Sequence, residues 1–117
     1  MTSKTDNSAL PVATQRQLDT PHGPAIGASY RWNGGQYCAI HTARGVVGCG
    51  IFDLASADTF GMAFAIARGT PAKPLSVPED LYEARIVGVS AAARKLGIAE
   101  GMTGLEAVGK MLSAAVS

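Results

Sequence analysis

The sequence predicts an α+β domain: an N-terminal antiparallel β-meander continues into a mixed sheet with short helices, and two helices follow at the C-terminus. Three observations lead to this prediction. Asn33-Gly34 stands between two strand-like runs, which is the strongest short-range signal for a hairpin. Residues 85–89 form a β-branched run that is typical of a strand. Thr103 and Glu106 match a capping box ahead of an apolar C-terminal segment, which indicates a helix.

The predicted meander has three strands. Tyr30 and Trp32 alternate with polar residues in the first strand, and residues 36–43 form the returning strand. The chain reverses again near Arg44-Gly45, and residues 46–53 form the third strand.

The N-terminal boundary follows from composition. Residues 1–22 are polar, and Pro21, Gly23 and Pro24 interrupt any regular pattern. We therefore expect a frayed tail over 1–22 and a single domain over 23–117.

Capping residues and periodicity predict the remaining elements. Residues 62–68 alternate with a period of two, which favours a strand, with a continuation of the preceding helix as the alternative. Four helices are predicted: one from Asp53 to Gly61, one from the capping box Ser76-Val77-Pro78-Glu79 to about Glu83, one that follows Ser90 and ends at Gly97, and one that follows Thr103. One face of the last helix carries Leu105, Val108, Met111 and Leu112.

Composition excludes several classes of function. The chain has 117 residues, a formal net charge of +1 and 6% aromatic residues, which argues against nucleic acid and anionic lipid as partners. We expect a cytoplasmic protein that does not enter the membrane, because no apolar stretch is long enough to span a bilayer and the N-terminus lacks a secretory signal. Both cysteines should be free thiols there, and we expect no cofactor.

Cys49 is the candidate reactive residue because it stands between Gly48 and Gly50 and close to Asp53. Glycines in a strand mark the close approach of a backbone or a ligand, so these four residues are the candidate ligand site. Cys49 and Asp53 lie ~13 Å apart in an extended strand, which does not support a cysteine–acid pair. Two interpretations remain: a buried thiol that fills space, or an exposed nucleophile that takes its base, His41, from another subunit.

The position of Cys49 relative to Cys38 depends on the second reversal. A two-residue turn at Arg44-Gly45 would place Cys49 opposite Ile40 and diagonal to Cys38. A three-residue loop with a bulge at Gly45 would place Cys49 opposite Ala39, so that the two thiols face opposite sides. Cys38 and His41 also face opposite sides of a strand, so we expect no metal site.

Two blocks of the sequence, RGVVGCGIFDL (44–54) and ARKLGIAEGMTGLEAV (93–108), resemble the YunC-like family of uncharacterised bacterial and archaeal proteins. The resemblance covers residues 36–112. It implies a small α+β domain that forms a homotetramer through its N-terminal β region, with no assigned reaction or ligand. The characteristic positions are Cys49, Gly50 and Asp53 in the first block and Gly101, Met102, Thr103 and Gly104 in the second.

The residues and the resemblance together predict an oligomeric domain of unknown role that binds a small molecule at the Gly-Cys-Gly strand. The alternatives are a thiol-dependent enzyme that uses Cys49 and a structural protein-interaction module. Ile26, Tyr30, Trp32 and Tyr37 cluster in a hairpin that is too small to be stable alone, so we expect it to pack on its own domain or on a neighbouring subunit.

Overall fold

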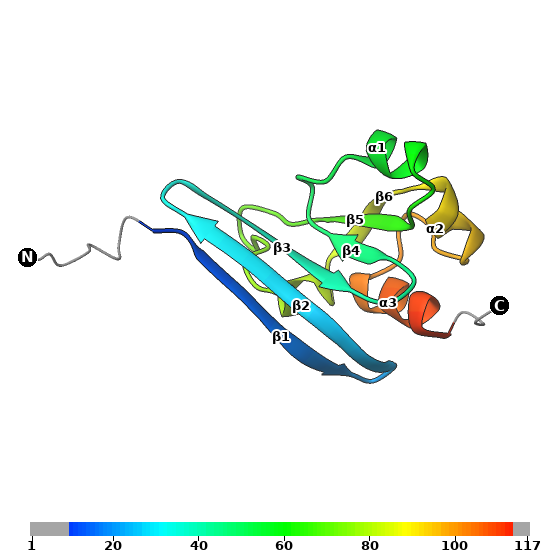
Figure 1. Ribbon diagram of the computed structural model, residues 1–117, viewed down its shortest axis with the longest axis horizontal. Coiled ribbons are helices and arrows are strands. Elements are labelled where there is room, and N and C mark those ends of the chain that lie inside the picture. The colour runs from blue at the N-terminus through cyan, green and yellow to red at the C-terminus, as the bar shows by residue number, and fades with distance from the viewer. Residues whose placement is uncertain (1–9, 114–117) are drawn as a thin grey trace, which may run out of the picture.

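A computed structural model of the chain describes residues 10–113 (Figure 1). Six strands form one sheet in the order β1-β2-β3-β4-β5-β6. The strands are β1 (Val12–Thr20), β2 (Gly23–Trp32), β3 (Gly35–His41), β4 (Val46–Gly48), β5 (Phe64–Arg68) and β6 (Arg85–Val89). The helices are α1 (Leu54–Thr59), the 3-10 turn η2 (Pro78–Leu81), α2 (Ala91–Lys95) and α3 (Gly104–Ser113).

The sheet is mixed, as the sequence predicts. Neighbouring strands are antiparallel except β4 and β5, which are parallel because the connection through α1 crosses over before β5 begins. The Asn33-Gly34 hairpin is confirmed, since Trp32 pairs with Gly35 and Gly34 has a φ of +107°. The strand interpretation of residues 62–68 is also confirmed as β5.

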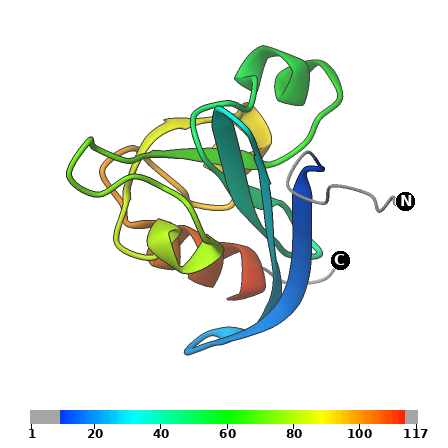
Figure 2. The ribbon, with the colours of Figure 1, turned by 90° about the vertical axis from the view of Figure 1, so that its left-hand side faces the viewer.

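The helix α3 and the 3-10 turn η2 cover one face of the sheet. Figure 2 shows α3 and η2 on the same side of the strands. Cys38, Ile40 and Val47 on the sheet belong to one buried cluster with Leu81 of η2 and helical residues of α3 that include Val108 and Met111. Burying each large side chain in this cluster contributes roughly 1.5–3 kcal/mol, which makes this side the core.

Capping groups fix the ends of the short helices. Ser90 Oγ accepts a hydrogen bond from the Ala93 amide at the start of α2, and Gly97 follows that helix with a φ of +93°. The capping box of α3 is confirmed, because the Thr103 amide donates to Glu106 Oε1 at 2.8 Å and the Glu106 amide donates to Thr103 Oγ1 at 3.1 Å.

The predicted capping box at Ser76–Glu79 is wrong. Residues 78–81 form one 3-10 turn, and the side chain that holds its start is Asp80, which accepts hydrogen bonds from the Ser76 and Val77 amides. The predicted third strand is also shorter than expected, since β4 ends at Gly48 and the chain turns between Cys49 and Phe52.

The expectation of a frayed tail over 1–22 is wrong for β1. β1 pairs with β2 along its whole length, and a two-residue turn at Pro21-His22 joins them. The strand has no alternating apolar pattern because it lies at the sheet edge, where only Leu18 and Thr20 are buried. Residues 1–9 of the expected tail lie outside the described residues.

The N-terminal edge strand is tied to the helical layer by an ion pair. Arg16 of β1 donates to Glu79 of η2, and this hydrogen bond is the main reason that the pKa of Glu79 lies below its usual value. None of the helices within residues 10–113 is long and apolar enough to cross a membrane.

Gly104 is expected to be the glycine least tolerant of a side chain. A Cβ at this position would lie 1.9 Å from the carbonyl oxygen of Leu81, so α3 would have to move away from η2. We predict that Gly104→Ala lowers the free energy of unfolding by about 2 kcal/mol or more, measured by urea denaturation.

Gly50→Ala is the matched control, because a Cβ at Gly50 would meet nothing within 4 Å. We expect this variant to stay within about 0.5 kcal/mol of the parent protein. Equal losses in the two variants would contradict the tight contact between α3 and η2.

Candidate functional site

Gly48 makes room for an aromatic ring. A Cβ at Gly48 would lie 2.4 Å from the ring of Phe52, whereas a Cβ at Gly50 would lie in open space. Phe52 reaches this position because the chain turns after β4, where the Phe52 amide donates to the Cys49 carbonyl at 3.4 Å. The close approach predicted from the glycines is therefore present at Gly48, and a residue of the same chain makes it.

Asp53 is the N-cap of α1. Its carboxylate accepts hydrogen bonds from the Ala55 and Ser56 amides, both at 3.2 Å, and from Ser56 Oγ at 2.7 Å. The hydroxyl of Ser56 is the main reason that the pKa of Asp53 lies below its usual value. These bonds direct the carboxylate toward α1, and ligand binding at Gly48, Cys49, Gly50 and Asp53 stays a prediction.

Cys38 and Cys49 lie directly opposite each other, which neither sequence-based register predicts. Ala39 pairs with Gly48 and Ile40 with Val47, so the next position pairs Cys38 with Cys49. The Cys49 amide donates to the Cys38 carbonyl at 3.3 Å. Both predicted registers of β3 and β4 are therefore wrong.

The register differs because the β3–β4 hairpin reverses one residue earlier than expected, at Ala43-Arg44. The Thr42 amide donates to the Gly45 carbonyl at 2.8 Å and closes the turn. Thr42 Oγ1 accepts hydrogen bonds from the Arg44 and Gly45 amides. A threonine that bonds its own turn is the signal that the sequence-based choice overlooked.

Both thiols are free and buried. Cys38 is 0% exposed and belongs to the core cluster, and Cys49 is 8% exposed. Burial, and to a lesser extent the charge of Cys49, raises the pKa of Cys38 to about 12. His41 is exposed and follows the alternation of β3 to the other face, so one chain does not bring His41 and Cys49 together.

The second motif block, Gly101–Gly104, holds α3 against β6. The Gly101 amide donates to the Ile86 carbonyl at 2.8 Å, and the Ile86 amide donates to the Met102 carbonyl at 2.7 Å. The Gly104 amide donates to the Ala84 carbonyl at 2.8 Å. The contacts of these residues are therefore structural, as are those of Gly48 and Asp53.

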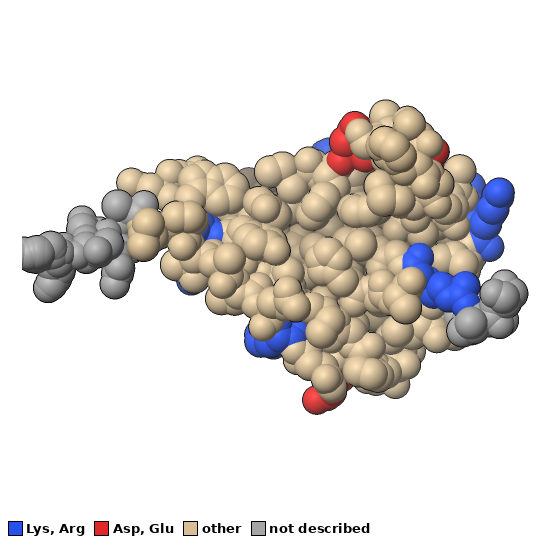
Figure 3. Space-filling view, viewed as in Figure 1, with Lys and Arg blue, Asp and Glu red and all other residues tan. Residues whose placement is uncertain are grey.

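An uncharged patch covers the other face of the meander. We call it the aromatic face and define it as Ile26, Ala28, Tyr30 and Trp32 of β2 with Tyr37 and Ala39 of β3. These residues share a face because Tyr30 pairs with Tyr37 and Ala28 with Ala39. Figure 3 views this side of the molecule, and the few charged side chains visible along the strands lie mostly toward their outer edge.

The rings of the aromatic face pack in a row. Tyr30 and Tyr37 stack with ring centroids 4.7 Å apart, and Trp32 meets Tyr37 edge-on at 5.8 Å. The row continues from Tyr37 to Phe52 at 6.0 Å and from Phe52 to Phe64 at 5.4 Å. The sequence predicted the aromatic cluster in the hairpin. It did not predict that Phe52 extends the cluster, because this contact depends on the turn after Cys49.

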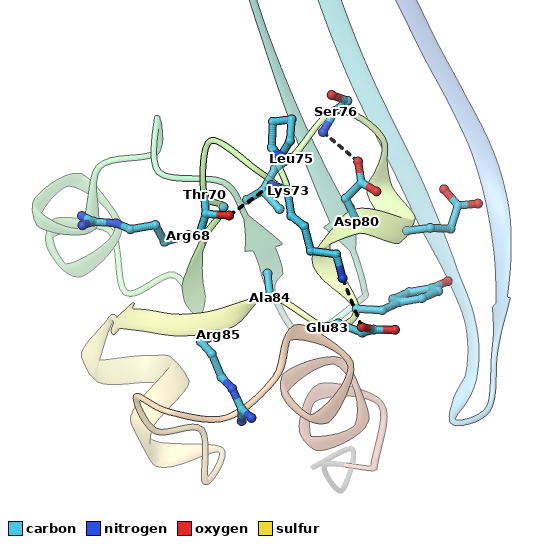
Figure 4. Close-up of a pocket in the computed structure, with 13 residues that line it drawn as sticks. Arg68, Thr70, Lys73, Leu75, Ser76, Asp80, Glu83, Ala84 and Arg85 are labelled. Carbon is cyan, nitrogen blue, oxygen red and sulfur yellow. Dashed lines mark hydrogen bonds and ion pairs between the residues drawn. The ribbon is translucent and has the colours of Figure 1, made fainter.

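A cavity lies between the end of β5, the loop before η2 and the start of β6 (Figure 4). It has a volume of about 620 Å³, and three basic and three acidic side chains line it. Lys73 Nζ lies 3.8 Å from Glu83 Oε1, whereas the side chains of Arg68 and Arg85 point away from Glu83. Because charges of both signs surround it, the cavity favours no class of charged ligand.

Two further features bear on the candidate site. The second cavity, of about 340 Å³, lies beside the aromatic face and includes Ile26 and His41 in its lining. Neither cavity is lined by Gly48, Cys49, Gly50 or Asp53. Within residues 10–113, no three His, Cys, Asp or Glu side chains form a group that would hold a metal ion.

Comparisons with known proteins identify a family and a fold. The family model described as "Domain of unknown function (DUF1805)" matches residues 48–111, more than half of the chain. The crystal structure of a protein of unknown function, TA1206 from Thermoplasma acidophilum, matches with a TM-score of 0.75 and 16% sequence identity over 86% of this chain and 94% of that chain. This likeness confirms the α+β fold. No curated protein matches the chain significantly.

The buried thiol of Cys38 predicts a loss of stability at alkaline pH. The unfolded chain ionises this thiol above pH 9.0, whereas the folded protein keeps its proton up to about pH 12. The unfolded state then binds fewer protons, so the free energy of unfolding falls by up to about 1.4 kcal/mol per pH unit between these values.

The measurement is urea denaturation between pH 8 and pH 11 of the parent protein and of Cys38→Ala. Tyrosine and lysine ionisation contributes to both proteins, so the difference in slope isolates the thiol. Parallel slopes would show that Cys38 ionises as easily in the folded protein as in the unfolded chain.

Proposed function

This chain belongs to the DUF1805 family of domains of unknown function, and from that premise we propose that it is a homo-oligomeric domain whose subunits meet through the aromatic face. The observation that carries the proposal is an apolar sheet face that no described helix covers. Trp32 is 46% exposed and Ile26 is 36% exposed toward the two ends of this face, with the buried Ala28 and Ala39 between them and the polar Gln17 and His41 opposite Ile26. Exposed apolar side chains that gather on one face mark interaction surfaces.

The uncharged character of the aromatic face supports a second copy as its partner. A two-fold interface brings one patch against an identical patch, so any charge on it would meet the same charge. The positions of β2 and β3 that form this face carry no lysine, arginine, aspartate or glutamate, and Arg31 of β2 lies on the opposite face with Gln36, whereas Asp19 of β1 lies on the same side at the sheet edge. Aromatic residues are also enriched in the buried centre of interfaces.

The dimensions of the face suit a modest interface. β2 has ten residues and therefore extends ~33 Å, and β1, β2 and β3 together span ~14 Å. The flat area is on the order of 450 Å² before side-chain relief, with Gln15, Gln17 and Asp19 of β1 at its rim, and it is smaller than the roughly 600 Å² per partner at the lower end of specific interfaces, so the interface is a weak one. Two such faces would pack as the sheets of a sandwich, ~10 Å apart.

The resemblance to the YunC-like family supports the same proposal, because it implies a tetramer assembled through the N-terminal β region. We also propose a cytoplasmic location, in which two free thiols would persist.

A thiol-dependent enzyme is the weaker candidate. Cys49 is nearly buried, and Cys38, the residue opposite it, lies in the core cluster. A base from another subunit, such as His41 on the aromatic side, would have to cross the sheet to reach this thiol. Small-molecule binding at the Gly-Cys-Gly strand would require Phe52 to leave Gly48.

The experiment is sedimentation velocity of the parent protein, Ile26→Lys and Val87→Lys. We expect the parent to sediment as a multiple of the 12.0 kDa chain and Ile26→Lys to shift toward the monomer, because the variant places two like charges in one interface. We expect the dissociation constant to rise at least tenfold, which corresponds to about 1.4 kcal/mol or more.

Val87→Lys is the matched control, since Val87 is also an exposed β-branched residue, at 45% against 36% for Ile26, and lies on β6 at the far edge of the sheet. It should assemble like the parent. A monomeric parent protein, or equal assembly of Ile26→Lys and the parent, would overturn the proposal.

A further inference from the structure

We propose that Cys38 and Cys49 form a reversible cross-strand disulfide when the protein meets a disulfide oxidant. The inference does not depend on the proposed assembly, because it concerns the core side of the sheet within one chain. The chain has only these two cysteines, so a single intramolecular bond is available.

The backbone register places the two residues within bonding range. Cys49 follows the last paired residue of β4, and its amide donates to the Cys38 carbonyl at 3.3 Å, which continues the ladder by one position. Directly opposed residues of a hydrogen-bonded antiparallel pair have Cα atoms ~5.5 Å apart. Disulfides usually join Cα atoms 4.4–6.8 Å apart, with a mode of about 5.5–6 Å.

The side chains leave the ladder on the same side. Cys38 belongs to the core cluster, and opposed residues of neighbouring strands project to one face. The charge of Cys49 contributes to the raised pKa of Cys38, as expected for two thiols that lie close together. The bond therefore needs no change of face.

The two thiols differ in access, and this difference sets the order of reaction. Cys49 is 8% exposed and is followed by Gly50, beside which a Cβ would meet only open space, whereas Cys38 is 0% exposed. We expect the Cys49 thiolate to attack a glutathione disulfide, forming a mixed disulfide and releasing one glutathione thiolate. The Cys38 sulfur then attacks the Cys49 sulfur, the bond between Cys49 and glutathione breaks, and the Cys38 proton passes to the departing glutathione thiolate.

The overall exchange converts two protein thiols and one glutathione disulfide into one protein disulfide and two glutathione thiols. The protein is oxidised by two electrons and the glutathione disulfide is reduced by the same two. In a reducing compartment the dithiol form prevails, and a rise in the oxidised glutathione pool shifts the equilibrium.

The bond would join β3 to the segment that turns away from the sheet. Cys49 lies immediately before the turn that carries Phe52 onto Gly48, and the Phe52 amide already bonds the Cys49 carbonyl. The crosslink would close a loop over residues 38–49 and would hold this turn against β3. Because it constrains the unfolded chain, we expect the oxidised protein to unfold at a higher urea concentration than the reduced protein.

The experiment uses the full chain without substitutions. The native protein is incubated with oxidised glutathione, the remaining thiols are blocked with iodoacetamide, and the intact mass is recorded. We expect a loss of about 2 Da, the mass of two hydrogen atoms, with no added glutathione, and full reversal by dithiothreitol. Trypsin cleaves after Arg44, between the two cysteines, so the product should contain peptide 32–44 linked to peptide 45–68.

Cys38→Ala provides the matched control, because it keeps the accessible thiol and removes the resolving one. We expect this variant to stop at the glutathione adduct of Cys49. The proposal is overturned if the native parent protein also stops at the adduct, if it gains disulfide-linked dimers instead, or if it loses the two hydrogens only in urea.

Discussion

The closure of the β3–β4 hairpin by Thr42 and Gly45 is the constraint on which the rest of the sheet depends. It places the reversal at Ala43-Arg44 and fixes which residues of the two strands lie opposite each other. A shift by one residue would send Val47 to the opposite face, away from α3 and Ile40. The same register puts Gly48 where Phe52 can pack and Cys49 beside Cys38, so the turn determines both the thiol pair and the start of the crossover to β5.

The two faces of the sheet serve different purposes as a consequence. The helical side is closed by α3 and η2, and the glycine at 104 lets their backbones touch. On the other side, the segment 50–59 covers the sheet from β4 to β6, where Phe52 packs on Gly48 and Leu54 contacts Gly88. The aromatic rings over β2 and β3 lie beyond this cover. An assembly through that face would complete the second half of a sandwich that one chain builds only in part.

Signals that act within a few residues of the sequence predicted much of the fold. The features that were not predicted depend on contacts between residues far apart in the chain. Asn33-Gly34, Ser90 and Thr103–Glu106 act within a few residues, and each structure they predicted is present. β1 was missed because an edge strand buries few side chains, and its stability comes from pairing with β2 and from the contact between Arg16 and Glu79. The cysteine pair was missed because a one-residue difference in a turn changes every cross-strand neighbour. The aromatic cluster of the hairpin was predicted, but its continuation through Phe52 required the turn after Cys49.

The most direct test of assembly through the aromatic face uses Trp32, the single tryptophan of the chain, which lies on that face. Its fluorescence and its quenching by iodide can be followed while the protein is diluted across the range in which sedimentation shows dissociation. Burial of Trp32 between subunits predicts that emission shifts to longer wavelengths, and that quenching increases, as the assembly dissociates. Emission and quenching that stay constant while the mass falls to that of the single chain would contradict the account, because the subunits would then meet through another surface.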